Sequence, residues 1–369
     1  MDLCHKRFST PVMKINKSLP LPGIAVIFTF ILLTTLFLSC QKNSVSNNPK
    51  TSPDTTKSVT GLDTGSNTIG ATMVAAMYTG TIATISFKPT VPVILNNKHD
   101  MVINGIATSS ITLYNCSNII IKNCKIGPNT QFGINITQCT NIKVDSCYIY
   151  MVSTGVYAGD SQTISVTNCQ AKNMMGPFPD GQFVQYKNVS GGGNRVSFNK
   201  FENILGESYT EDAISMYKSN GLPTDPIVIE SNWIKGGGPS SSGGGIMLGD
   251  GGGTYMIAKN NFLVDAGQYG MAVSGGSYMS IINNTIYGKS QPFTSEGIYY
   301  LNYTALPSTN IVITKNAINF TNSKNVLNDT YLGPGQTAPI GWANNVYSAS
   351  LNATILPESI VSGSIFLSQ

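Results

Sequence analysis

The stretch NIIIKNCKI at residues 118–126 reads as a short buried strand that ends beside a cysteine. The same frame returns as NIKVDSCYI at 141–149 and as TISVTNCQA at 163–171. Farther along, asparagine takes the place of the cysteine, in PIVIESNWI at 226–234, YMSIINNTI at 278–286 and NIVITKNAI at 310–318. An internal repeat with a period of roughly 20 to 50 residues indicates a solenoid, a propeller or an array.

Eight copies of the frame place cysteine or asparagine in one column, called the ladder column below, at spacings of 22 to 33 residues. Its predicted members are Cys124, Cys147, Cys169, Asn199, Asn232, Asn260, Asn284 and Asn316. In every copy the residues three places before and two places after the column are apolar. A second apolar column, often preceded by glycine, runs through Ile111, Ile134, Val156, Phe183, Ile214, Ile246, Met271 and Ile298. Each repeat therefore holds at least two short alternating strands.

The repeat excludes a βαβ architecture, because 22 residues cannot hold two strands and a crossover helix. The remaining architecture is a coil whose strands stack on the equivalent strands of the next coil, about 4.8 Å away. The pattern resembles the right-handed parallel β-helix repeats of the pectate-lyase-like superfamily over roughly residues 90–325. We therefore predict an all-β chain with a right-handed parallel β-helix of about nine to ten coils.

The ladder column is predicted to point into the coil, where stacked asparagine amides can bond one another and the turn backbone. Cysteine fills the same position as a small hydrophobic residue without needing those bonds. Five cysteines follow residue 40, and disulfides are one interpretation of them. In-register parallel neighbours are poorly placed for disulfide geometry, so buried free thiols are the favoured one.

The N-terminal segment is predicted to direct export. An uncharged apolar run at 21–38 follows basic residues and precedes Ser39 and Cys40. The run and the sequence FLSC resemble a bacterial lipoprotein signal, which implies that Cys40 carries the lipid; an uncleaved membrane anchor is the alternative. The predicted organisation is a signal at 1–39, with Met13 as a possible start, a polar tether at 40–68 and the β-helix at 69–369. We expect a cell-envelope location, periplasmic or on the surface.

The charge balance excludes one class of partner. The net charge is +4, and the first 39 residues contribute four cations against one anion, so the remainder is nearly neutral. Such a chain lacks the basic surface that nucleic acid requires. The only histidines are His5 and His99, so a catalytic triad, a histidine-based zinc site and the motif of polygalacturonase-like hydrolases lack their residues.

Long insertions precede the second strand column in the later coils, as MMGPFPDGQ, LGESYTED, GGGPSSSGGG and VDAGQYG. In solenoids such insertions collect on one face, which is often the binding face. Beside them we predict outward-facing tyrosines that bind the apolar faces of sugar rings. These are Tyr157, Tyr186, Tyr217 and Tyr299. The alternative is that tyrosine is simply favoured in strands.

A candidate catalytic pair is Lys187 with Lys218, which recur in the matching frames QYKN and MYKS. Stacked amines lower one another's pKa, as a lysine base in a β-elimination lyase needs. Calcium could assist such a lyase, with four carboxylates at the loop bases as candidate ligands. These are Asp180, Glu211, Asp212 and Asp250. The alternative is a salt ladder of Asp160, Lys187, Lys218 and Asp250 along the coil edge.

Three function classes stay open at this point. The first is an enzyme acting on polysaccharide, most specifically a lyase on an acidic glycan. The second is a glycan-binding surface protein without turnover, and the third is an adhesive or structural β-helix. The expected partners are a polysaccharide and, through Cys40, a membrane, with no nucleic acid and a monomeric chain.

Overall fold

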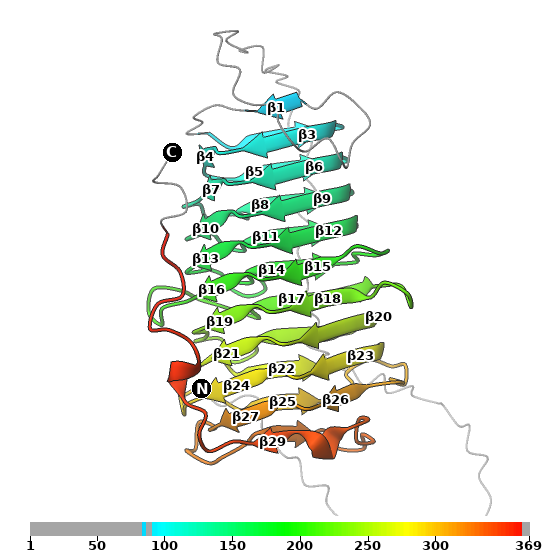
Figure 1. Cartoon of the computed structure of the whole chain (residues 1–369), viewed down its shortest axis with the longest axis vertical. Coiled ribbons are helices and arrows are strands. Elements are labelled where there is room, and N and C mark those ends of the chain that lie inside the picture. Colours follow the sequence, from blue (N-terminus) through cyan, green and yellow to red (C-terminus); the bar gives the residue numbers. More distant parts are fainter. Residues whose placement is uncertain (1–82, 86–90, 364–369) are drawn as a thin grey trace, which may run out of the picture. The chain divides into compact units, whose positions relative to one another are not determined.

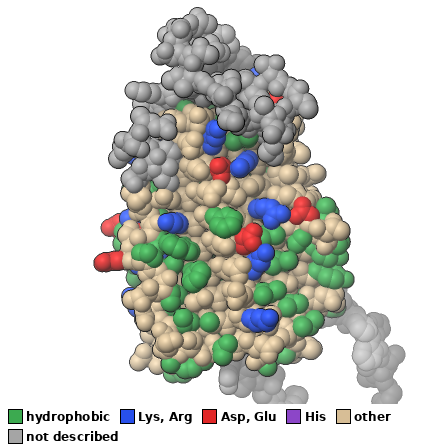
Figure 2. Space-filling model, in the orientation of Figure 1, with side chains coloured by type: hydrophobic (Ala, Val, Ile, Leu, Met, Phe, Trp, Pro, Cys, Tyr) green, Lys and Arg blue, Asp and Glu red, His purple; other side chains and the backbone are tan. Residues whose placement is uncertain are grey.

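The computed structural model describes residues 83–85 and 91–363 (Figure 1 and Figure 2). The predicted signal at 1–39, the lipidation residue Cys40 and the tether at 40–68 lie outside the described residues. None of the described helices has the length and apolarity of a membrane span.

Short parallel strands form three series, in which each strand pairs with the equivalent strand of the next coil (Figure 1). The first series comprises β2 (Val93–Asn96), β5 (Ile111–Tyr114), β8 (Ile134–Thr137), β11 (Val156–Gly159), β14 (Val184–Lys187), β17 (Ile214–Asn220), β20 (Ile246–Lys259), β22 (Tyr269–Val273), β25 (Glu296–Tyr300) and β28 (Thr330–Leu332). The second comprises β1 (Ala83–Ile85), β3 (His99–Asn104), β6 (Ser117–Lys122), β9 (Thr140–Asp145), β12 (Gln162–Thr167), β15 (Arg195–Ser197), β18 (Ile227–Glu230), the second half of β20, β23 (Ser277–Ile282) and β26 (Val312–Thr314).

The third series is a separate sheet of ten strands within the described residues. It comprises β4 (Ala107–Thr108), β7 (Lys125–Ile126), β10 (Tyr148–Tyr150), β13 (Gln170–Lys172), β16 (Lys200–Glu202), β19 (Trp233–Lys235), β21 (Phe262–Val264), β24 (Thr285–Gly288), β27 (Ala317–Phe320) and β29 (Val346–Tyr347). Two 3-10 turns, η1 (Trp342–Asn344) and η2 (Ala353–Ile355), follow the last full coil. The three series enclose one interior, so the predicted parallel β-helix is confirmed.

Alternation along each strand decides what the interior contains. In β6, for example, Ile119 and Ile121 are fully buried, and their partners Ile142 and Val144 on β9 continue the same two columns. Because side chains alternate between the two faces of a strand, the apolar repeat columns stack into continuous rows inside the coils. The rows bury apolar surface at every coil, which is the main stabilising term of such a solenoid.

The ladder column is a continuous row of buried amides in the later coils. The Nδ2 atom of Asn199 donates to Oδ1 of Asn232 at 2.9 Å, and Asn232 donates to Oδ1 of Asn261 at 2.9 Å. The same 2.9 Å contact links Asn261 to Asn284 and Asn284 to Asn316. Each amide also donates to a backbone carbonyl, so these buried polar groups are satisfied.

One predicted member of the ladder column was wrong. Asn261 is fully buried and occupies the column, while Asn260 is exposed at a corner with a φ of 57°. The prediction was displaced by one residue because Ile257 and Phe262 happen to be apolar at the expected offsets. In the structure their neighbours Ala258 and Leu263 are the inward residues.

Cysteine occupies the column in the earlier coils, as a buried free thiol. Cys124, Cys147 and Cys169 are all buried, as are Cys116 and Cys139, and none of the five forms a disulfide. The favoured prediction of free thiols is confirmed. Burial raises the pKa of the Cys139 thiol to about 11, and the pKa of Cys147 is also raised well above its usual value, by burial above all.

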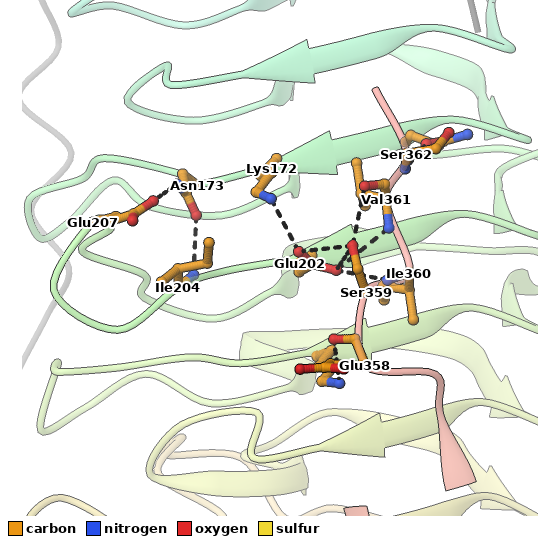
Figure 3. Close-up of polar contacts among 12 residues, drawn as sticks. Lys172, Asn173, Glu202, Ile204, Glu207, Glu358, Ser359, Ile360, Val361 and Ser362 are labelled. Atoms are coloured by element: carbon orange, nitrogen blue, oxygen red, sulfur yellow. Dashed lines mark hydrogen bonds and ion pairs between the residues drawn. The ribbon is translucent and has the colours of Figure 1, made fainter. Parts of the chain in front are cut away.

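The C-terminal strap, residues 351–363, crosses the outer face of the third series (Figure 3). Leu356, Ile360 and Val361 pack against side chains of that sheet. Lys235 Nζ donates to the backbone oxygens of Pro357 and Glu358, both at 2.6 Å. The strap therefore joins coils that are more than a hundred residues away in sequence.

Candidate functional site

The outer face of the first series is covered by loops in the middle coils. The connections at 173–183, 203–213 and 236–245 are long and lead from the third series into the first. Outward positions of the strands they precede, Ser215 and Met247, are buried although they do not face the interior. The long insertions of the sequence thus enclose a second layer of side chains outside the β-helix interior.

Two adjacent carboxylates, Glu211 and Asp212, lie fully buried in this layer, just before β17. Glu211 accepts hydrogen bonds from the hydroxyls of Ser240 and, at 2.6 Å, Ser242. Asp212 Oδ1 accepts from the Tyr269 hydroxyl and, at 3.2 Å, from the backbone N–H of Gly244. Ionised groups are costly to bury, so these bonds hold the loop at 236–245 in place around the pair.

Two tyrosines pack beside the carboxylates. The rings of Tyr269 and Tyr299 meet edge to face, with centroids 5.0 Å apart and an interplanar angle of 81°. Burial raises the pKa of Tyr299 well above its usual value, and the nearby Tyr303, Asp212, Glu296 and Asp250 raise it further. Tyr299 therefore lies close enough to these acidic groups to feel their charge.

We refer to Asp212, Asp250, Tyr269, Glu296 and Tyr299 as the acid–tyrosine cluster. Asp250 and Glu296 are partly exposed, whereas the other three members are buried. Burial raises the pKa of the Glu296 carboxyl, so this group retains its proton to a higher pH than an exposed glutamate. The cluster thus combines carboxyl groups and aromatic rings on one outer face.

Of the four predicted sugar-binding tyrosines, Tyr186 was placed on the wrong side of its strand. It is fully buried in the interior, where its hydroxyl donates to the backbone oxygens of Ile164 at 2.9 Å and Arg195 at 3.1 Å. The strand column contains Val184 rather than Phe183, since Val184 pairs with both Val156 and Ile214. This shift by one residue reverses the faces of β14.

The other three tyrosines lie on the outer side. Tyr157 is partly exposed and stacks on Phe132, with centroids 4.9 Å apart. Tyr217 is partly exposed at the end of the first-series section of β17, and Tyr299 belongs to the acid–tyrosine cluster. Their role in sugar binding stays a prediction.

Lys187 and Lys218 do not stack in one column, contrary to the prediction. Lys187 pairs with Tyr217 of the next coil. The residue that aligns with Lys218 is therefore Asn188. Asn188 Nδ2 donates to Asp160 Oδ1 at 2.8 Å. The Nζ atom of Lys218 lies 5.1 Å from the centre of the Tyr217 ring.

The alternative salt ladder through both lysines is also wrong. Lys218 forms no ion pair within residues 91–363. The same one-residue shift in β14 that turned Tyr186 inward separates the two lysines into different columns.

The four predicted calcium ligands do not assemble into a metal centre. No group of three or more histidine, cysteine, aspartate or glutamate side chains in the described part of the chain could hold a metal ion. Glu211 and Asp212 bond instead with hydroxyls and backbone, and burial raises the pKa of Asp180. A carboxyl group must lose its proton to bind a hard cation, and a raised pKa disfavours that loss.

Sequence analysis missed Tyr269, Glu296 and the serines at 240 and 242. The serines and Tyr269 belong to the insertions GGGPSSSGGG and VDAGQYG, which were identified as loops of the binding face, whereas Glu296 begins β25. The clue within them was a tyrosine next to a glycine, which precedes the apolar column two coils after the Glu211–Asp212 pair.

A sequence profile described as a right-handed β-helix region matches residues 93–206. None of the curated proteins compared with the chain matches it. Among solved structures, the surface adhesin PfbA of Streptococcus pneumoniae is similar, with 14% identity and a TM-score of 0.41 over 62% of this chain and 61% of the adhesin chain.

The tailspike of Escherichia coli bacteriophage HK620, solved in complex with a pentasaccharide, is similar at 11% identity and a TM-score of 0.43, covering 73% of this chain and 59% of that one. An exopolygalacturonase of Thermotoga maritima aligns at 10% identity and a TM-score of 0.31, over 55% of this chain and 54% of that one. The alignments thus span only about three fifths of these chains or less, and they assign no function. Together with the three strand series, the profile shows that the chain has the right-handed parallel β-helix fold.

Proposed function

We propose that this protein binds a polysaccharide on the outer face of the first series, with the acid–tyrosine cluster as the centre of contact. The observation that carries this proposal is the set of buried carboxylates and tyrosines outside the β-helix interior. The interior is already complete without them, and buried carboxylates cost stability. Ionisable groups retained at such a cost cluster at functional sites.

The chemistry of the cluster matches that of a sugar. A carboxylate offers about four lone-pair sites, so Asp250 and Glu296 can accept hydrogen bonds from neighbouring sugar hydroxyls. Tyrosine rings offer flat apolar faces and a polar edge to the same ligand. Both groups recur over successive coils, which suits a chain of linked sugars better than a single small molecule.

The charge of the cluster favours a neutral glycan. Asp250 and Glu296 are the partly exposed members, and an ionised carboxylate near a uronic acid would repel it. Lys187 and Lys218, predicted to stack as the catalytic base of a lyase, occupy different columns. A lyase acting on an acidic glycan is therefore the less favoured form of the proposal.

Hydrolysis of the bound glycan is a second candidate, favoured by the raised pKa of Glu296. A glycosidase needs one protonated carboxyl to donate to the leaving oxygen and a second, ionised carboxylate as base or nucleophile. Glu296 is the candidate acid, and Asp250 is the candidate second carboxylate.

The test measures binding and turnover on one panel of neutral and acidic polysaccharides, by affinity gel electrophoresis and by release of reducing ends. Asp250→Asn and Glu296→Gln should each weaken retardation by the bound glycan, while Tyr347→Phe, on the third series, serves as the control. Unchanged retardation in both cluster variants would refute the site. A rise in ultraviolet absorbance during incubation with polyuronate would instead show lyase activity on an acidic glycan.

We further propose that the chain is exported and anchored by lipid at Cys40. The support is the apolar run at 21–38 between basic residues and Ser39-Cys40. An anchored glycan-binding protein would hold its polysaccharide at the cell envelope.

A further inference from the structure

Two tyrosines occupy a backbone position that disfavours them. Tyr255 and Tyr278 sit at the corner where the chain enters the second series, with φ values of 55° and 59°. Bulky L-residues rarely adopt this left-handed conformation, whereas asparagine, aspartate and glycine adopt it readily. A strained position of this kind directs attention to function.

Other coils show what the position normally holds. The equivalent residues in earlier coils include Asp100, Asn118, Asn141, Thr163 and Gly193, all with positive φ. The side chains of the first three form a short amide row, with Asn118 donating to Asp100 at 2.8 Å and Asn141 donating to Asn118 at 2.9 Å. The two tyrosines replace such a row by aromatic rings.

The rings stack on each other but are not enclosed. Their centroids are 4.5 Å apart, with an interplanar angle of 19°, and 44% of Tyr278 remains exposed. Neither phenol hydroxyl has a hydrogen-bond partner among the described residues. Stacking of the two rings therefore explains neither the positive φ of the two tyrosines nor the position of their phenol hydroxyls.

The second face of the Tyr278 ring points toward the next coil, where the column holds the shorter Asn310. Asn310 is exposed, and its amide has no hydrogen-bond partner within residues 91–363. The flat apolar face of Tyr278 thus lies beside the Asn310 amide, whose donor and acceptor form no hydrogen bond within residues 91–363. On the other side Pro226 precedes Tyr255 in the column and extends the apolar row.

The coils that follow Pro226 carry no charge at this corner, whereas Asp225, next to Pro226, pairs with Arg195 at 3.5 Å. The segments 251–258, 271–288 and 297–314, which pass this corner, contain no lysine, arginine, aspartate or glutamate. Hydroxyl groups border the rings, including those of Thr254, Ser277 and Thr309.

We infer that Tyr255, Tyr278 and Asn310 form a second glycan-binding site, separate from the acid–tyrosine cluster, for a neutral pyranose. The sugar ring stacks on the open face of Tyr278, and the Asn310 amide bonds its hydroxyls. A neutral sugar fits better than a charged peptide or a nucleic acid, because no charged residue lies on these segments to pair with one.

The experiment uses a property of this corner. Tyr278→Asn returns the position to a residue that favours positive φ, so it should leave the melting temperature unchanged or raise it. The same change should weaken glycan binding at least about tenfold, because it removes the ring face. Asn310→Ala should also weaken binding. Tyr347→Asn, at a similarly exposed tyrosine on β29, should do neither.

Binding is measured by calorimetry with cellohexaose, laminarihexaose, xylohexaose and mannohexaose. The background is an Asp250→Asn, Glu296→Gln double variant, which isolates this site from the proposed function. Binding retained in that background and lost on adding Tyr278→Asn supports the inference, even if the cluster proves not to bind sugar. Binding that disappears in the double variant alone refutes it while leaving the cluster proposal intact. A lower melting temperature with unchanged affinity in Tyr278→Asn would show a purely structural stack, and no binding by the unmodified protein would also refute the site.

Discussion

Glu202 accepts a 2.6 Å hydrogen bond from the backbone N–H of Ile360, a residue 158 positions later in the chain. The same carboxylate accepts from the hydroxyl of Ser359 at 3.1 Å and pairs with Lys172 at 3.2 Å (Figure 3). One side chain of the third series thereby holds the centre of the C-terminal strap. The strap forms no ladder with the sheet, so its attachment depends on such contacts and on its apolar side chains.

Acid should detach the strap. Burial alone would raise the pKa of Glu202, but the hydrogen bond from Ile360 and the contact with Lys172 outweigh it and hold the pKa below its usual 4.5. A carboxyl with a lowered folded-state pKa contributes stability above pH 4.5 and loses it as the pH falls through the folded value. Trp233 packs beside the strap, so its fluorescence in a Trp342→Phe background should change below pH 4.5.

Glu202→Gln is the matched variant for this titration. It should show the detached fluorescence of Trp233 already at neutral pH, or a clearly weaker pH dependence. If the acid transition of the variant matched that of the unmodified protein, another group would have to control the strap.

The ladder column predicts a difference between two adjacent asparagines. Asn261→Leu should destabilise the protein by about 1–3 kcal/mol, because Asn232 and Asn284 lose buried hydrogen-bond partners. Asn260→Gly should change stability by less than about 0.5 kcal/mol, since glycine retains the positive φ at an exposed corner. Chemical denaturation of both variants measures the difference, and equal losses would contradict the assigned column.

Tyr186 should behave as a structural residue. Tyr186→Phe removes the donor for two buried carbonyls, so we expect a loss of about 1–3 kcal/mol in the free energy of unfolding. Polysaccharide binding should not change, because the ring faces the interior. Reduced affinity with unchanged stability would place this side chain on the outer surface after all.

Lipid attachment is tested at Cys40. Cys40→Ala should abolish incorporation of labelled fatty acid and release the protein from the membrane fraction into the soluble one. A protein that stays in the membrane fraction after this change would instead support the uncleaved anchor at 21–38. Cys116→Ala, at a buried thiol, is the control and should alter neither property.

The fold could be predicted from sequence because the interior of a β-helix repeats in every coil. A residue such as Ile121 meets the same requirement as Val144 and Ile313, and that requirement is visible as an apolar column. Register was less secure wherever two adjacent residues both satisfied the column. Asn260 with Asn261 and Phe183 with Val184 are the two cases, and in both the inward residue was the second.

The acid–tyrosine cluster could not be predicted to the same extent. Asp212, Tyr269 and Glu296 come from loops and strand ends of different coils, and the insertions that carry them have no common length. The repeat columns predict the positions of residues within strands but not within loops. The pair of Tyr255 and Tyr278 could not be predicted either, because the sequence does not show the positive φ that the two residues adopt at their corner.

The change from cysteine to asparagine along the ladder column has a mechanical consequence. From Asn199 to Asn345 each side-chain amide of the column is hydrogen-bonded to the next, so the unfolding of one coil breaks hydrogen bonds of its neighbour. Between Cys124 and Cys169 the thiols are weak donors and acceptors, so these coils are joined by backbone ladders and apolar rows without a row of bonded amides. Pulled from its N-terminal side, the solenoid should lengthen first in small steps of one coil, and then resist as a single block until it ruptures at once.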